Sequence, residues 1–184
     1  MIHSTLRLVV FLLLCGALSA AEPPGVWLDV PFVKQEQNGC GAAAIAMVMQ
    51  YWHRQQGSVP NVGAEEIQRT LYSRPAHGIY ASAMEQYFEE HGFRTFAFRG
   101  EWKDLKEHLE KGRPLIVALH AGYDSLHYVV VTGLDWQQGL VLKNDPAERK
   151  LLKQDRSNFE REWKAAGNWT LLAVPQQGER LSSQ

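Results

Sequence analysis

The residues from Gly41 to Met49 (GAAAIAMVM) form an uninterrupted apolar run of good helix formers. No turn-forming residue follows before Gln55, so we predict a helix over 41–55. Because its first half is apolar on all sides, this helix has to be buried inside the protein and not laid on its surface. A helix of this kind needs neighbours on every side, and a chain of 184 residues is long enough to supply them as one domain.

Helical patterns dominate the first part of the chain, and β-branched strand patterns follow them. The predicted helices are 41–55, 64–73, 79–90, 102–111 and 157–166; the predicted strands are 27–33, 93–98, 114–120, 126–132, 139–143 and 168–174. This order predicts an α+β fold in which the buried helix packs on an antiparallel sheet. We expect one domain at 28–175, between a leader segment at 22–27 and a polar tail at 176–184.

The N-terminus is typical of a secretory signal peptide. A weakly positive start precedes an apolar run at 8–14, which is short for a membrane span, and small residues follow as far as Ala21. We predict a signal peptide at 1–21, cleaved after Ala20 or Ala21, and a protein exported to the periplasm or the medium. An uncleaved membrane anchor is the alternative.

Removal of the signal peptide would take Cys15 with it and leave Cys40 as a lone cysteine. An intramolecular disulfide is then excluded, which leaves a reactive thiol or an intermolecular bridge. Cys40 stands between Gly39 and Gly41 at the start of the buried helix, where the helix dipole favours a thiolate. The alternative is a small buried side chain without chemistry.

A thiolate nucleophile needs a base and a group that orients the base. His120 ends one predicted strand and His127 begins the next, and we favour His127 because a rigid strand holds it. Asp145 closes the neighbouring strand, and Pro146 keeps it out of the helical conformation. Asp145 can therefore orient His127, although an Asp-Pro pair is also typical of a plain turn.

Four segments together resemble the C39 peptidases, a papain-like cysteine peptidase family known for clipping double-glycine leader peptides. They are VPFVKQ, NGCGAAAIAMVMQYW, HYVVVTG and NDP, and the resemblance covers about residues 28–175. It implies a papain-like fold and no cofactor. It also implies that Cys40 is the nucleophile, His127 the general base and Asp145 the orienting carboxylate.

The family's oxyanion glutamine usually stands six residues before the cysteine, where this chain has Lys34. Gln35 stands five residues before Cys40 and is our candidate, with Gln37 as a poorer second. If neither amide faces the site, oxyanion stabilisation would depend on backbone N–H groups alone.

We expect an exported cysteine peptidase that hydrolyses peptide bonds in leader peptides or other exported peptides. The alternatives are a peptidoglycan-peptide amidase and an inactive peptide-binding module. Tyr80, Tyr123 and Trp136 are candidate walls of a peptide cleft, the last two lying in loops that we expect beside His127.

Other functional classes are disfavoured by composition and motif. A formal net charge of −1 gives no electrostatic basis for binding nucleic acid or an anionic membrane. The sequence has no phosphate-binding loop motif, so we expect no role for ATP. The spacing of His120 and His127 does not match a zinc site.

Overall fold

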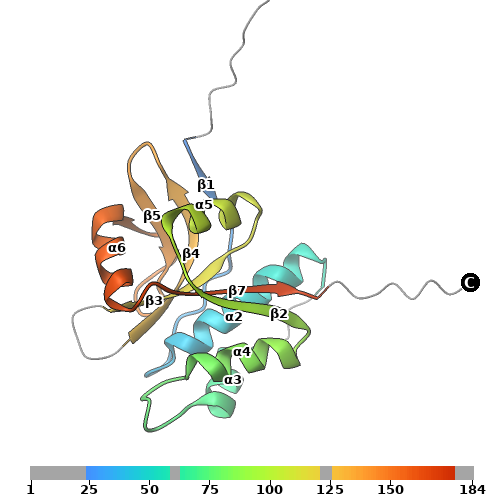
Figure 1. Cartoon of the computed structure of the whole chain (residues 1–184). Helices are drawn as coiled ribbons and strands as arrows, with labels where there is room; N and C mark the ends of the chain where they lie inside the picture. The colour runs from blue at the N-terminus through green and yellow to red at the C-terminus, as the bar shows by residue number, and fades with distance from the viewer. Residues whose placement is uncertain (1–23, 59–62, 121–125, 177–184) are drawn as a thin grey trace, which may run out of the picture.

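The computed structural model describes residues 24–58, 63–120 and 126–176, and in these residues helices cover both faces of one antiparallel sheet (Figure 1). The predicted signal peptide and nearly all of the polar tail lie outside the described residues. The helices are α2 (Cys40–Gln55), α3 (Ala64–Leu71), α4 (Ala81–Glu90), α5 (Trp102–Glu110) and α6 (Arg156–Ala165). The strands are β1 (Gly25–Trp27), β2 (Phe93–Arg99), β3 (Leu115–His120), β4 (Leu126–Asp135), β5 (Leu140–Asn144), β6 (Leu152–Asp155) and β7 (Trp169–Pro175).

The strands are ordered β2-β7-β3-β4-β5-β6, and each neighbouring pair is antiparallel. β1 pairs with the C-terminal end of β4, at Gly133–Asp135. This part of β4 lies beyond Val131, which faces the first residue of β3. The two backbones approach closely there, because a Cβ added at Gly133 would lie 2.5 Å from the carbonyl oxygen of Val26. The predicted α+β class and antiparallel sheet are confirmed.

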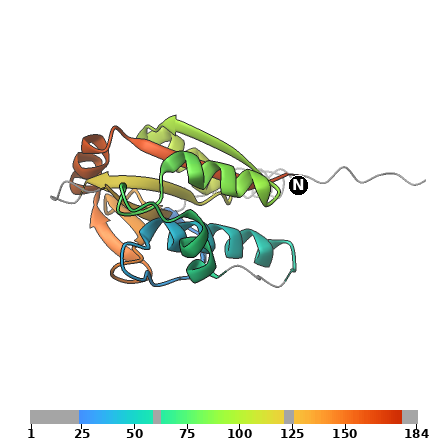
Figure 2. The ribbon, with the colours of Figure 1, turned by 90° about the horizontal axis from the view of Figure 1, so that it is seen from below.

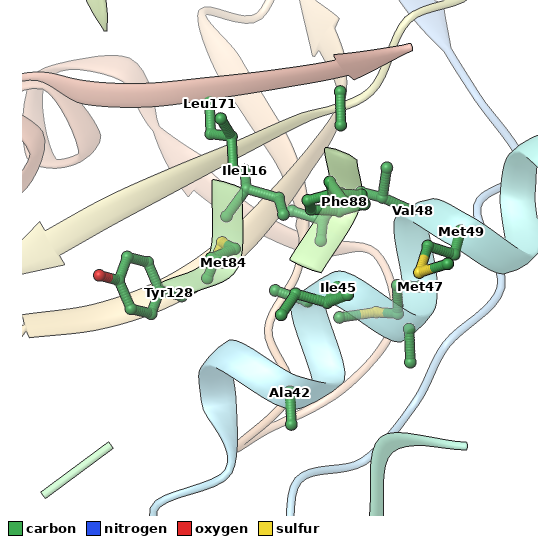
Figure 3. Close-up of a cluster of buried hydrophobic side chains, with 14 of the residues drawn as sticks. Ala42, Ile45, Met47, Val48, Met49, Met84, Phe88, Ile116, Tyr128 and Leu171 are labelled. Atoms are coloured by element: carbon green, nitrogen blue, oxygen red, sulfur yellow. The ribbon is translucent and has the colours of Figure 1, made fainter. Parts of the chain in front are cut away.

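Helix α2 lies under one face of the sheet, as its apolar sequence predicts (Figure 2). Every residue from Gly41 to Met49 is buried. Figure 3 shows the contact layer, in which side chains of α2 meet Phe88 of α4, Ile116 of β3 and Leu171 of β7. This packing fixes the position of the first residue of α2, which is Cys40.

The opposite face of the sheet is covered by α5 and α6. Leu105 and Leu109 of α5 and Phe159 and Trp163 of α6 are fully buried there against alternate residues of β3 and β4. Because both faces are covered, the central strands contain apolar runs, at Leu115–Leu119 of β3 and Tyr128–Val131 of β4. Within the described residues, no helix combines the length and the apolar character needed to cross a membrane.

Two sequence predictions about strands are wrong. The strand expected at 27–33 forms earlier, at Gly25–Trp27, and residues 28–36 have no regular secondary structure. Pro31 lacks an N–H group for a sheet ladder, and side-chain bonds occupy neighbouring carbonyls. Strand β6 was not predicted, because its sequence LKQD is short, polar and poor in β-formers.

The side chain of Asn144 joins three segments that are far apart in sequence. Its Nδ2 donates to the carbonyl oxygens of Val30 and Pro31 at 3.1 and 3.4 Å. Its Oδ1 accepts from the backbone N–H of Leu151 at 3.0 Å. Asn144 is fully buried, so these bonds fasten the irregular segment 28–36 to the end of β5.

Replacing Asn144 with Ala should lower the free energy of unfolding by about 1–3 kcal/mol, because backbone groups of the buried Val30 and the partly buried Leu151 would lose their partners. Urea unfolding followed by circular dichroism measures this. Gln137→Ala, an exposed change in the β4–β5 turn, is the control and should have little effect. Equal stability of the two variants would contradict the role given to Asn144.

Candidate active site

Cys40 is the first residue of α2, and Gly39 is its N-cap. Within the described ranges, no side chain caps this helix end, so the field of the first turn acts on the sulfur. The thiol is half-buried. The space beside Gly41 is taken by Ile79, because a Cβ added at Gly41 would lie 3.1 Å from the Cβ of Ile79.

The structure brings His127 and Asp145 together. His127 Nε2 lies 2.7 Å from Asp145 Oδ1, which also accepts from the backbone N–H of Ala147 at 3.1 Å. The carboxylate is almost fully buried, whereas the imidazole keeps about a fifth of its surface exposed. His120, the alternative base, ends β3 and has no such bond with Asp145.

The sheet leaves room for Cys40 beside His127. Pairing between β4 and β5 begins only at Val130, opposite Asn144, so His127 lies in the part of β4 that extends past β5. Cys40 reaches this part of the strand, where the sulfur hydrogen-bonds the side chain of His127 and the backbone of Tyr128. Since Nε2 of His127 is bound to Asp145, the ring presents Nδ1 to the sulfur.

Opposing effects set the pKa values of the thiol and the imidazole. Burial alone would raise the pKa of Cys40, but hydrogen bonds from His127, Tyr128 and Gly41 bring it below the ordinary value of 9.0. Burial likewise opposes the charge on His127, but Asp145 and Cys40 raise its pKa to about 9.

The pKa of Asp145 is also set by opposing effects. Burial would raise the pKa of Asp145, yet its bond to His127 and the nearby Lys143 charge hold that pKa below the ordinary value. The arrangement therefore shifts the balance toward a thiolate, an imidazolium and a carboxylate in a row. In this state the proton already resides on His127, so His127 is an acid before it is a base.

Gln35 is half-buried, whereas Lys34 and Gln37 are exposed. The backbone N–H of Gln35 donates to the carbonyl oxygen of Pro146 at 3.0 Å, which joins this segment to the turn that carries Asp145. Its side-chain Oε1 is buried and has no hydrogen-bond partner among the described residues. Of the two glutamines considered, Gln35 is therefore the one whose backbone is bonded to the turn beside Asp145.

Sequence analysis missed Lys143. Its ammonium lies 3.5 Å from Asp145 Oδ2, and only 6% of its side chain is exposed. Together with His127 and Asp145 it lines a cavity of about 550 Å³. The available signal was a lysine inside the apolar strand sequence LVLKN, only two residues before Asp145.

Of the three residues predicted to line a peptide cleft, two lie among the described residues. Tyr80 is 52% exposed and directly follows Ile79, so it lies close to the start of α2. The prediction that Trp136 lies beside His127 is wrong, because the two residues are nine positions apart along the extended β4, which corresponds to roughly 30 Å. Trp136 packs against the core under α5, and Lys106 lies over its ring. Tyr123 lies outside the described residues.

Comparison with known proteins places these features in context. The family described as Peptidase_C39 like family matches residues 27–171, which include all the residues discussed above as a candidate site. No curated protein sequence matches the chain.

Several solved structures share the fold. A protein from Bacillus anthracis assigned as a C39-like peptidase has 18% identity and a TM-score of 0.67, over 84% of this chain and 100% of that one. The peptidase domain of Streptococcus ComA, a bi-functional ABC transporter involved in a quorum sensing pathway, has 22% identity and a TM-score of 0.63, over 79% and 98%. A double glycine motif protease from an AMS/PCAT transporter, in complex with the leader peptide, has 24% identity and a TM-score of 0.62, over 82% and 95%. These neighbours confirm the expected papain-like fold.

Cys40 should react with iodoacetamide at pH 6 much faster than an ordinary thiol, because its pKa is lowered and thiolate persists as the pH falls. A second change in rate is expected near pH 9, where His127 loses its proton. In His127→Asn the lowering effect of the imidazole is lost, so the onset of reactivity should move to higher pH than in the wild type. Peptide mapping of alkylated Cys40 over a pH series measures both inflections, and His120→Asn should retain the wild-type profile. A wild-type onset near pH 9 would contradict an activated thiol.

Proposed function

Because this chain belongs to the Peptidase_C39 like family, and is thereby a cysteine-type peptidase, we propose that it cleaves peptide bonds through a Cys-His-Asp triad. The residues proposed to act are Cys40, His127, Asp145 and Gln35. The observation that carries the proposal is the 2.7 Å bond between His127 and a buried Asp145, with the other side of the imidazole bonded to Cys40 at a helix N-terminus.

In the first half of the reaction the Cys40 thiolate attacks the carbonyl carbon of the scissile bond. The carbonyl electrons move to oxygen, and the side-chain amide of Gln35 and the backbone N–H of Cys40 stabilise the oxyanion. The tetrahedral intermediate collapses as the C–N bond breaks. His127 gives its Nδ1 proton to the departing amine, which leaves a thioester on Cys40 and a neutral imidazole.

In the second half, His127 acts as the base that its neutral form allows. It takes a proton from water as the oxygen attacks the thioester, and the C–S bond then breaks to release the acid. The thiolate and the imidazolium are restored together. Asp145 stays ionised throughout, because its part is to hold the ring and to stabilise its positive charge.

We propose exported peptides, including leader peptides, as the substrates. The signal-peptide pattern of residues 1–21 supports an exported location. A leader peptide is bound in one of the structures that share the fold, which supports a peptide ligand of this kind. Tyr80, exposed beside the start of α2, is a candidate contact for the peptide.

Cys40→Ala should abolish peptide hydrolysis while leaving the thermal unfolding midpoint nearly unchanged, since the thiol is only half-buried. His127→Ala should lower kcat/KM by at least about 10³, because attack and protonation of the leaving amine both use the imidazole. A fluorogenic peptide library, with products identified by mass spectrometry, provides the assay. His120→Asn is the matched control and should keep wild-type activity. Turnover by Cys40→Ala would refute the mechanism.

Gln35→Ala should lower kcat by about 10²–10³ with little change in KM, because the lost donor acts on the oxyanion and not on the bound substrate. Gln37→Ala tests the alternative on the same assay and should have less than about a threefold effect, because Gln37 is exposed. If Gln37→Ala shows the larger loss, the assignment of the two glutamines is reversed.

A further inference from the structure

We propose that Lys143 is a positioning residue of this site: its ammonium holds one oxygen of Asp145, so that the other oxygen faces His127. The inference rests on the proposed function and extends it. Asp145 Oδ2 lies 3.5 Å from Lys143 Nζ, whereas Oδ1 lies 2.7 Å from His127 Nε2. Each carboxylate oxygen therefore has a cationic partner of its own.

The backbone places Lys143 for this purpose. It lies on β5, opposite Val131 of β4 and Leu152 of β6, and its side chain is 6% exposed. Burying an ammonium costs desolvation free energy, and an ammonium in a surface ion pair largely avoids this cost because it stays hydrated. An apolar residue at this position would avoid the cost, so a role in stability alone explains Lys143 poorly.

Other charged groups line the same cavity, but in the described part of the chain they form no ion pair with Asp145. They are Glu148 in the turn after β5, Lys153 on β6 and Glu162 on α6. Among the described residues, only His127 and Lys143 form ion pairs with Asp145. Lys153 is exposed, so it is a natural control for a lysine of this cavity that does not touch the triad.

The sign of the electrostatic effect follows from the charge. A nearby positive charge lowers the pKa of every titratable group around it, because it favours each deprotonated form. The Lys143 charge lowers the pKa of Asp145, as noted above. Removing it should raise the pKa of Asp145. It should also raise the pKa of Cys40, because the site loses a positive charge and the imidazolium that stabilises the thiolate is less well held. The pH range of the thiolate–imidazolium pair should then begin at a higher pH.

The test is the pH dependence of Cys40 alkylation by iodoacetamide, an uncharged reagent that requires no knowledge of the substrate. In Lys143→Met, the lower inflection, which reports the thiol, should move to higher pH by about 0.5 or more. Lys143→Arg, which keeps the charge, and Lys153→Met, which removes the exposed lysine of the cavity, should keep the wild-type profile. Lys143→Gln serves as a second neutral variant if Lys143→Met does not fold, as judged by circular dichroism.

The outcomes separate this proposal from the one it rests on. A wild-type profile in the neutral variants, or a loss of reactivity that is equal at every pH, would overturn the role of Lys143 while leaving the triad intact. The same upward movement in Lys153→Met would also overturn it, because the effect would then belong to the cavity as a whole. An ordinary-thiol profile in the wild type would instead refute the triad itself.

Discussion

Burial of α2 on all sides is the constraint on which the rest of the structure depends. The helix has no polar face over Gly41–Met49, so the sheet, α3 and α4 must close around it. A helix enclosed in this way cannot rotate or slide without opening voids in the core. Its N-terminus is therefore held in place, and Cys40 with it. The position of the thiol is therefore fixed by apolar packing that takes no part in the chemistry.

The second condition is a difference in strand length at one end of the sheet. β4 extends past the point where its pairing with β5 begins, which opens a space at the end of β5. His127 comes from the extended part of β4, Asp145 from the first residue after β5, and Cys40 from the helix end below. Asn144 and the bond between Gln35 and Pro146 fasten the segment that carries the oxyanion candidate to the same place.

Sequence reasoning succeeded where local pattern and burial agree. The helices and most strands were predicted to within a few residues, because amphipathic and β-branched patterns reflect the face that each element buries. It failed for residues 28–36, where an extended apolar pattern is held by Asn144 and not by a sheet ladder. It also failed for β6, whose pairing is determined by β5 and not by its own composition, and for Trp136, which was placed at the wrong end of β4.

The sequence by itself determined that one thiol stands at the start of a buried helix, that a strand begins with a histidine and that another ends with an aspartate. These are local properties, because residue type and spacing along the chain determine them. Only the tertiary structure decided that His127 rather than His120 meets Asp145, that the carboxylate lies between the imidazole and the Lys143 ammonium, and that the backbone of Gln35 is bonded to the turn after Asp145. Those relations depend on strand register and on mutual desolvation between residues as far apart in sequence as Cys40 and Asp145, and no local pattern carries that information.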